Sequence, residues 1–244
     1  MTRNLRYSAL VLRVRPIGES NREAFFLTAE NGIVRATIFG GPKSKLRSCI
    51  SPFHQGTLWV YHDTVKDFMK VTDFDVKQWR LGLRELYERS MAAAALVDTV
   101  TASHAGGGNW AAALERAGRT LDALDSADEP MVQRVFYHFL WNWIDLIGEK
   151  PSLRGCSLCD SSFGGGAVLY APVEGAFLCP SCGEGRQGIL LGIGARKWLA
   201  AVENLPPAAL NRWSLDTGSL AQVRSVTVAL MAGLLGRRLE SWNW

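Results

Sequence analysis

The chain has 244 residues, of which 48% are hydrophobic and 20% are charged, and this composition is typical of a globular protein. It excludes a disordered, collagen-like or fibrous chain, and at this length a hydrophobic core forms without disulfides. The longest apolar stretch, residues 226–235, is about half of the roughly 20 residues that a membrane-spanning helix needs, so we expect a cytoplasmic protein.

The formal charge of +4 is distributed unevenly along the chain. Residues 1–80 contain 13 Lys and Arg against 7 Asp and Glu, whereas residues 81–244 contain 14 against 16. A net charge of +6 on the first third is typical of a segment that faces an acidic polymer, most often nucleic acid and sometimes an anionic membrane. A solvated basic face is the alternative interpretation.

Residues 1–79 are rich in β-branched and aromatic side chains, with turn signals at short intervals. Five strands are predicted, at Leu5–Val14, Glu23–Thr28, Ile33–Phe39, Thr57–His62 and Phe68–Phe74. Asn31 and Gly32 are predicted to supply the positive-φ residues of a tight turn between the second and third strands. This pattern fits an OB-fold barrel, which often binds single-stranded nucleic acid, and an SH3-like barrel fits almost as well.

From Arg80 to the end of the chain the apolar period is helical, which predicts a helical domain over residues 80–244 and an α+β protein overall. Helices are predicted at Leu81–Thr101, Trp110–Leu124, Pro130–Ile147, Ala195–Val202 and Ser219–Leu239. The first should bury one apolar stripe, formed by Leu83, Leu86, Tyr87, Met91 and Ala94. Asp128 and Gly148 have the residue types that begin and end the third helix.

A segment rich in Gly, Cys and Pro, residues 151–190, interrupts the helices. It holds two CxxC knuckles separated by nineteen residues, formed by Cys156, Cys159, Cys179 and Cys182. This spacing predicts a zinc finger with one structural Zn²⁺, because four thiolates complete a tetrahedron. A redox CxxC pair and disulfides are the alternatives, and both are disfavoured in a cytoplasmic chain. Cys49 has no partner knuckle and is expected to be a small buried residue.

The loop after the third predicted strand contains two glycines and three cations, Lys43, Lys45 and Arg47. Glycines allow the backbone to approach a phosphate and the cations neutralise it, so we expect contacts to a nucleic-acid backbone here. Further cations are expected to point outward from the barrel and to form a stripe along a DNA or RNA strand. They are Arg13, Arg15, Arg22, Arg35, Lys66 and Lys70.

The aromatic residues of the same segment are expected mostly to fill the barrel, with one or two stacking on bases. They are Tyr7, Phe25, Phe26, Phe39, Phe53, Trp59, Tyr61 and Phe68. Catalytic motifs are not apparent: the four histidines lie in different segments, and Asp73 and Asp75 have no third acidic partner in a nuclease motif. We therefore do not expect an enzyme.

The order of these parts resembles the bacterial RecO family of DNA repair and recombination mediators. The residues that carry the resemblance are Ala9 to Arg13, Gly18 to Ser20, Thr28, Gly32, the loop from Gly40 to Ser44, Pro52, Phe53, Leu146 to Gly148, Pro151, Leu153 and the two knuckles. They extend over most of the chain, and their order and spacing are more specific than any one of them.

The resemblance implies a protein that binds single- and double-stranded DNA through its barrel and anneals complementary strands. It also implies that RecR is a partner with which the protein loads RecA onto DNA coated by single-stranded-DNA-binding protein. The helical domain would bind the acidic C-terminal tail of that coating protein, and the protein would be associated with the nucleoid. Lys43, Lys45, Arg47 and the four cysteines match the family positions. A zinc-ribbon module of transcription or translation and a metal-dependent nuclease are the alternatives.

Overall fold

The computed structural model describes residues 4–40 and 44–244 and divides into two compact units, Met1–Ser126 and Ala127–Trp244. The first unit contains a barrel followed by two long helices, and the second contains four further helices, one of them only four residues long, and a small three-stranded sheet. Each unit has its own buried apolar residues, so the two are described separately.

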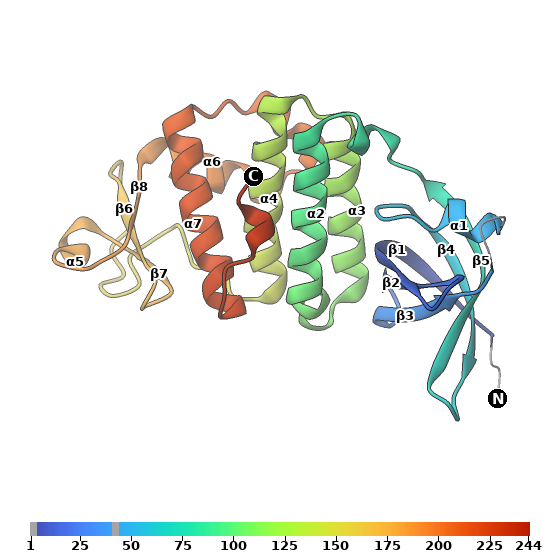
Figure 1. Ribbon diagram of the computed structural model, residues 1–244. Coiled ribbons are helices and arrows are strands. Elements are labelled where there is room, and N and C mark those ends of the chain that lie inside the picture. The colour runs from blue at the N-terminus through green and yellow to red at the C-terminus, as the bar shows by residue number, and fades with distance from the viewer. Residues whose placement is uncertain (1–3, 41–43) are drawn as a thin grey trace. The chain divides into compact units, whose positions relative to one another are not determined.

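Five strands of the first unit close into a barrel in the order β1-β2-β3-β5-β4 (Figure 1). Their bounds are Asn4–Ile17, Asn21–Thr28, Gly32–Ile38, Gln55–Asp63 and Phe68–Gln78 for β1 to β5. Neighbouring strands are antiparallel except β3 and β5, which are parallel. This order, with the short helix α1 (Lys45–Cys49) between β3 and β4, is that of an OB-fold, so the predicted five-stranded barrel is confirmed.

The barrel interior is filled from alternate strand positions, as the two-residue period of a strand requires. On β3, for example, Val34, Ala36 and Ile38 are buried, whereas Arg35 between them is exposed. The same alternation buries Ala9, Val11, Phe26, Leu58, Val60, Val71 and Phe74. The intervening positions face outward, which places most of the basic residues of β1 to β5 on the outer surface.

The hairpin between β2 and β3 differs from the predicted two-residue turn. Thr28 pairs with Gly32, so three residues form the loop, and Gly32 has a positive φ of 61° whereas Asn31 does not. The Thr28 hydroxyl accepts a hydrogen bond from the N–H of Asn31 and donates one to the carbonyl of Gly32, which closes this longer loop. A Cβ at Gly32 would lie 3.0 Å from the ring of Trp110, so the position requires glycine for space as well as for φ.

Two helices, α2 (Tyr87–Ala102) and α3 (Trp110–Ser126), follow the barrel in the first unit after a 3-10 turn at Leu81–Arg84. The predicted apolar stripe of α2 is wrong: the side chain of Tyr87 is 68% exposed. The residues that α2 buries are mainly small ones, Ala92, Ala93, Ala95, Leu96, Val97, Thr99 and Val100. Small side chains allow a neighbouring backbone to approach closely. The buried face of α2 is therefore the one that carries most of its alanines, and not the one that carries Tyr87 and Met91.

Arg80 joins the barrel to α3 within the first unit. Its side chain is 2% exposed, and Nε donates to Asp122 Oδ1 at 2.7 Å. The two terminal nitrogens donate to the carbonyl of Phe53, to Gln55 Oε1 and to the carbonyl of Gly118, at 2.7, 2.7 and 3.2 Å. One guanidinium thus satisfies groups from β4, from the loop before it and from α3.

In the second unit, α4 (Glu129–Ile147) has the termini that the sequence indicates. Asp128 Oδ1 accepts a hydrogen bond from the N–H of Met131 at 3.1 Å, and Gly148 ends the helix with a φ of 88°. The helices α6 (Ile193–Val202) and α7 (Thr217–Leu235) pack against α4. α7 ends four residues before the predicted Leu239, because Gly236 adopts a φ of 65° and caps it.

α7 is the one helix in the described part of the chain that is long and apolar enough to span a membrane. However, α4, α6 and strand β8 (Ile189–Leu191) all pack against it, and Val223, Val226 and Leu230 are buried there. Its apolar character therefore reflects its place as a core helix of the second unit.

The interrupting segment forms a small sheet in the order β7-β6-β8. β6 (Val168–Ala171) is central and pairs antiparallel with both β7 (Ala176–Leu178) and β8. The short helix α5 (Pro180–Gly183) follows β7, and 3-10 turns at Pro207–Arg212 and Glu240–Trp242 complete the unit.

Replacement of Arg80 tests the link between the barrel and α3. We expect Arg80→Met to lower the free energy of unfolding of the full chain by about 3 kcal/mol, because it leaves buried carbonyl groups without a donor. The matched control is Arg119→Met, which removes an exposed cation paired with Glu115 on α3 and should cost less than about 1 kcal/mol. Guanidinium-induced unfolding measures both, and equal costs would show that the Arg80 contacts do not stabilise the fold.

Candidate metal centre and nucleic-acid surface

Cys156, Cys159, Cys179 and Cys182 come together in the second unit. Their four sulfur atoms lie within 4.8 Å of one another, and the Sγ atoms of Cys159 and Cys179 are 3.8 Å apart. Sulfur atoms placed about 2.3 Å from a tetrahedral Zn²⁺ are separated by about 3.8 Å. The spacing of the cluster therefore fits a tetrahedral metal site.

The two knuckles are built from different local structures. The carbonyl of Cys156 accepts a hydrogen bond from the N–H of Asp160 at 2.9 Å, which closes a tight turn around the first knuckle. Cys179 lies immediately before α5, and its sulfur accepts a hydrogen bond from the N–H of Cys182 at 3.5 Å. N–H groups directed at sulfur stabilise the thiolate, which is the form that binds a metal.

The surroundings shift the pKa values of three of these thiols in different directions. Burial raises the pKa of Cys156, but hydrogen bonds from the N–H groups of Cys179, Leu158 and Cys159 outweigh it and lower this pKa to about 6. The N–H of Cys182 lowers the pKa of Cys179, whereas the side chains of Cys159, Cys179 and Cys156 raise that of Cys182 to about 12. A cation bound between the sulfur atoms would favour deprotonation of Cys182, because it would balance the negative charge of the neighbouring thiolates.

The chemistry of the donor set fits a structural metal better than a hydrolytic one. Four thiolates fill a tetrahedral coordination sphere and leave no position for a reactive water. Within residues 4–40 and 44–244, this is the one group of three or more potential ligands that come together, and it includes no histidine. Among the described residues, Asp73 and Asp75 have no third potential metal ligand beside them. Asp73 Oδ1 instead accepts a hydrogen bond from the N–H of Phe74 at 2.8 Å.

Arg196 of α6 holds the cysteine segment to the helices of the second unit. The residue is 8% exposed, and its guanidinium donates to the carbonyl of Phe163 at 2.5 Å and to that of Gly164. It also lies 5.7 Å from the centroid of the Phe163 ring. The N–H of Ser157 donates to the carbonyl of Phe177, which links the first knuckle to β7.

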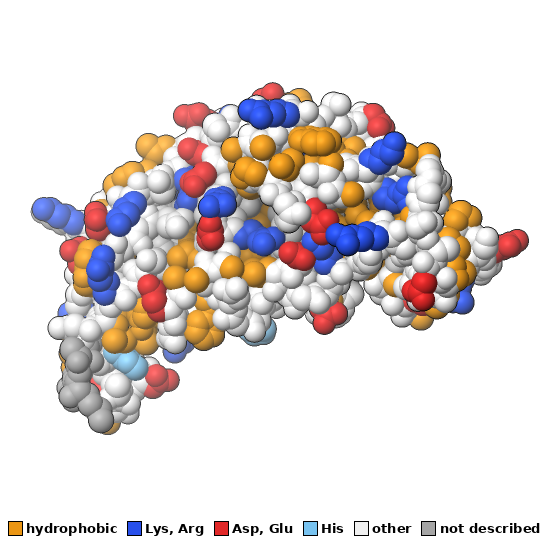
Figure 2. Space-filling view, turned by 180° about the vertical axis from the view of Figure 1, so that it is seen from behind, with side chains coloured by type: hydrophobic (Ala, Val, Ile, Leu, Met, Phe, Trp, Pro, Cys, Tyr) orange, Lys and Arg blue, Asp and Glu red, His pale blue; other side chains and the backbone are white. Residues whose placement is uncertain are grey.

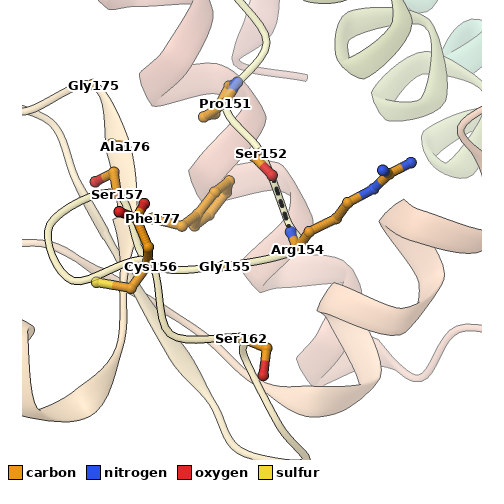
Figure 3. A pocket seen from close by; sticks show the side chains of 11 residues that line it. Pro151, Ser152, Arg154, Gly155, Cys156, Ser157, Ser162, Gly175, Ala176 and Phe177 are labelled. Carbon is orange, nitrogen blue, oxygen red and sulfur yellow. Dashed lines mark hydrogen bonds between the residues drawn. The ribbon is translucent and has the colours of Figure 1, made fainter.

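A recess of about 500 Å³ lies beside Cys156, between the segment before the first knuckle and the start of β7 (Figure 3). The backbone N–H of Arg154 donates to Ser152 Oγ at 3.1 Å, and the Arg154 side chain extends away from Cys156 and Phe177. The recess is thus lined mostly by small side chains beside the buried thiol, together with Arg154, Asp160 and Phe177.

The predicted basic loop is described only in part. Lys43 lies outside the described residues, whereas Lys45 and Arg47 are on α1, where Lys45 is exposed and Arg47 is half-buried. Cys49 ends the same helix and is half-buried rather than fully buried, packed against the barrel core, with its carbonyl 2.8 Å from His54 Nδ1. Burial lowers the pKa of His54, so this histidine is neutral at pH 7.

Three of the predicted strand arginines are engaged in ion pairs. Arg13 lies 3.1 Å from Asp98 of α2, and Arg15 and Arg35 both approach the carboxylate of Glu23, whose side chain is 7% exposed. Figure 2 shows Lys and Arg side chains lying next to acidic ones on one face, rather than a continuous basic band. The predicted stripe of free cations is therefore interrupted on β1 to β3.

The remaining predicted cations form a different set. Arg22, Lys45, Arg47, Lys66 and Lys70 have no acidic partner within the described part of the chain. Lys66 lies in the turn between β4 and β5, and Lys70 lies on β5, with its ammonium 5.4 Å from the centroid of the Phe39 ring. No acidic side chain of the described residues therefore offsets the charge of these five cations.

Sequence reasoning missed one element of this surface, a pairing of cations with aromatic rings. The Arg6 guanidinium lies 5.9 Å from the centroid of the Trp59 ring, on neighbouring positions of β1 and β4. The rings of Phe39 and Phe68 meet edge to face with their centroids 6.0 Å apart. The signal that could have found these rings is strand alternation, because Trp59 and Phe39 each neighbour a buried inward residue, Val60 and Ile38.

Comparison with known proteins matches two family descriptions along the chain. "Recombination protein O N terminal" matches residues 1–78, and "Recombination protein O C terminal" matches residues 84–243. The first match covers the barrel, and the second covers the helices and the cysteine cluster.

Curated proteins named DNA repair protein RecO are similar over nearly the whole chain. One from Anaeromyxobacter sp. (strain K) is 27% identical over 97% of this chain and 94% of its own length. Relatives from Desulfitobacterium hafniense and Maridesulfovibrio salexigens are 24% and 22% identical, over 96% and 93% of this chain and 86% and 93% of their own lengths. The barrel, the four-cysteine cluster and these matches agree with one another, and the chain belongs to the RecO family of DNA repair and recombination proteins.

Proposed function

We propose that this protein is a non-enzymatic, DNA-binding mediator of DNA repair and homologous recombination. The observation that carries the proposal is the set of cations without acidic partners on an OB-fold, next to outward-facing aromatic rings, in a member of the RecO family. Cations neutralise phosphates and exposed rings stack on bases, so this surface has the chemistry of a nucleic-acid-binding barrel.

DNA binding in this proposal begins with the phosphates. Lys45 and Arg47 lie on α1, which packs against β5. Lys70 lies on β5, which pairs with β3, and Lys66 lies in the turn before it. Arg22 pairs with the same end of β3. A DNA strand that follows these cations meets positive charge on successive elements. Lys43, which lies outside the described residues, is proposed to contribute a further phosphate contact.

The metal in this proposal is one structural Zn²⁺. Four thiolates at tetrahedral spacing are the donor set that zinc prefers, and Cys156, Cys159, Cys179 and Cys182 would hold it. When bound, the ion supplies the charge that balances the thiolates and orders the segment around β6, β7 and α5. It takes no part in a reaction.

The second unit would recruit protein partners while the barrel holds DNA. These partners are RecR, the C-terminal tail of single-stranded-DNA-binding protein and, indirectly, RecA. Membership in the RecO family supports DNA and recombination proteins as the classes of partner. By holding one strand and contacting the protein that coats another, the chain would bring complementary strands together in the cytoplasm, at the nucleoid, and favour their annealing.

The first test is strand annealing. Two complementary oligonucleotides coated with the cognate single-stranded-DNA-binding protein should pair faster when this protein is added, and neither strand should be cut. The pairing of fluorescently labelled strands measures the rate, and a denaturing gel measures cleavage. DNA binding without acceleration would favour a zinc-ribbon binding module instead, and cleavage in the presence of Mg²⁺ would favour a nuclease.

The second test concerns α1. We expect Lys45→Glu/Arg47→Glu to weaken DNA binding and to make the slope of log K against log salt less negative by about 1.5 to 2, because about two phosphate contacts are lost. The control, Lys197→Glu/Arg212→Glu, makes the same change in net charge in the second unit. If both double variants have the same slope, α1 is not part of the DNA-binding surface.

The third test concerns the metal. Cys156→Ser should lose the single equivalent of zinc and lower the thermal stability of the second unit, with a smaller effect on DNA binding by the barrel. Cys49→Ala, which alters a cysteine outside the cluster, should keep one equivalent. Zinc content after gel filtration and a thermal melt provide the measurements, and full zinc retention by Cys156→Ser would contradict the four-ligand site.

A further inference from the structure

A pocket of about 570 Å³ lies on the outer surface of the barrel where β1, β3, β4 and β5 run side by side. Tyr61 of β4 pairs with Asn4 of β1 on one side and with Lys70 of β5 on the other. Lys70 in turn pairs with Thr37 of β3, the strand that leads into Phe39. Four strands therefore contribute to one surface, whose volume lies within the range of roughly 300–1,000 Å³ found for small-ligand sites.

The walls of this pocket are aromatic. Phe39, Tyr61 and Phe68 all line it, and the rings of Phe39 and Phe68 meet at an angle of 65° with centroids 6.0 Å apart. The side chain of Phe39 is 42% exposed, although the neighbouring Ile38 is fully buried in the barrel. Rings that lie at the end of β3 and the start of β5 and are left partly open to solvent provide a surface on which a flat, apolar face can stack.

The rim of the pocket is cationic. Lys66 and Lys70 line it, and the Lys70 ammonium lies 5.4 Å from the Phe39 centroid. One acidic side chain also lines it, but Asp63 Oδ1 accepts hydrogen bonds from the N–H groups of Val65 and Lys66 at 3.0 and 3.2 Å. Oδ1 of this carboxylate is thus engaged by the turn between β4 and β5, and two ammonium groups against one carboxylate leave the charged side chains that line the pocket with a net positive charge.

We propose that this pocket binds one unpaired base of a single-stranded DNA, with the adjacent phosphates held by Lys66 and Lys70. The inference rests on the proposed DNA-binding function and specifies its substrate. The base stacks on Phe39 and Phe68. The Lys70 ammonium moves from the ring of Phe39 to a phosphate, so a cation–π contact is replaced by an ion pair.

This arrangement discriminates between single and double strands. In a duplex each base face is covered by its stacked neighbours, so only the phosphates are available to the lysines. In a single strand the base face is free, and stacking on an aromatic ring adds roughly 1–3 kcal/mol per base. The pocket therefore adds affinity for unpaired DNA beyond what the phosphate contacts give to both forms.

The test compares three DNA probes at one salt concentration by fluorescence anisotropy. They are a single-stranded oligonucleotide, a blunt duplex of the same length, and a single strand of abasic sites that keeps the phosphates but lacks the bases. We expect the full-length protein to bind the ordinary single strand at least tenfold more tightly than the abasic strand.

Two variants then assign this preference to the pocket. Phe39→Ala should weaken binding of the ordinary single strand about tenfold and leave the duplex and the abasic strand unchanged, whereas Phe39→Trp should restore it. The matched control is Phe25→Ala, which removes a half-buried ring that lies under Arg15 on β1 and β2, outside the pocket. This control should keep the preference for the ordinary single strand.

The outcomes separate the inference from the function on which it rests. If the unaltered protein binds none of the three probes, the proposed DNA-binding function fails, and the pocket assignment fails with it. If the protein binds DNA but Phe39→Ala keeps the preference, or the abasic strand binds as well as the ordinary one, the pocket assignment alone is overturned. Phe39→Trp keeps a folded barrel in the comparison if the alanine variant is unstable.

Discussion

The first unit depends on one buried cation. Removing the Arg80 guanidinium from water is costly, and the protein offsets that cost by giving it acceptors on Asp122, Gln55 and two carbonyls. Because the acceptors come from both the barrel and α3, the same contacts fix the helix on the barrel. Gly118 is part of this arrangement, since a Cβ there would lie 2.6 Å from Gln55 Oε1.

The packing of α2 against the barrel also determines which basic residues form ion pairs and which stay available to bind a ligand. Asp98 of α2 pairs with Arg13, and the buried Glu23 draws Arg15 and Arg35 together on the barrel wall. Three arginines of β1 to β3 are thereby paired, whereas Arg22 on β2 and the cations on α1 and near the turn between β4 and β5 have no acidic partner among the described residues. The same region carries the open aromatic rings of Phe39 and Phe68, so charge and stacking surface coincide there.

The second unit meets a related constraint with different chemistry. The segment around β6, β7 and α5 is short and rich in glycine, and it buries Val168, Tyr170, Phe177 and Leu178. The four clustered cysteines and Arg196, which donates to the carbonyls of Phe163 and Gly164, add directed contacts to this burial.

The sequence by itself determined the features that depend on local spacing. Strand alternation and turn residues indicated five strands, Asp128 and Gly148 marked the ends of α4, and the CxxC spacing identified the four clustered cysteines. Features that depend on distant partners were decided only in the tertiary structure. Arg13 and Lys70 look alike in the sequence, yet one meets Asp98, 85 residues away, and the other meets an aromatic ring. Which cations form ion pairs, and which therefore remain available to a ligand, depends on residues that only folding brings together.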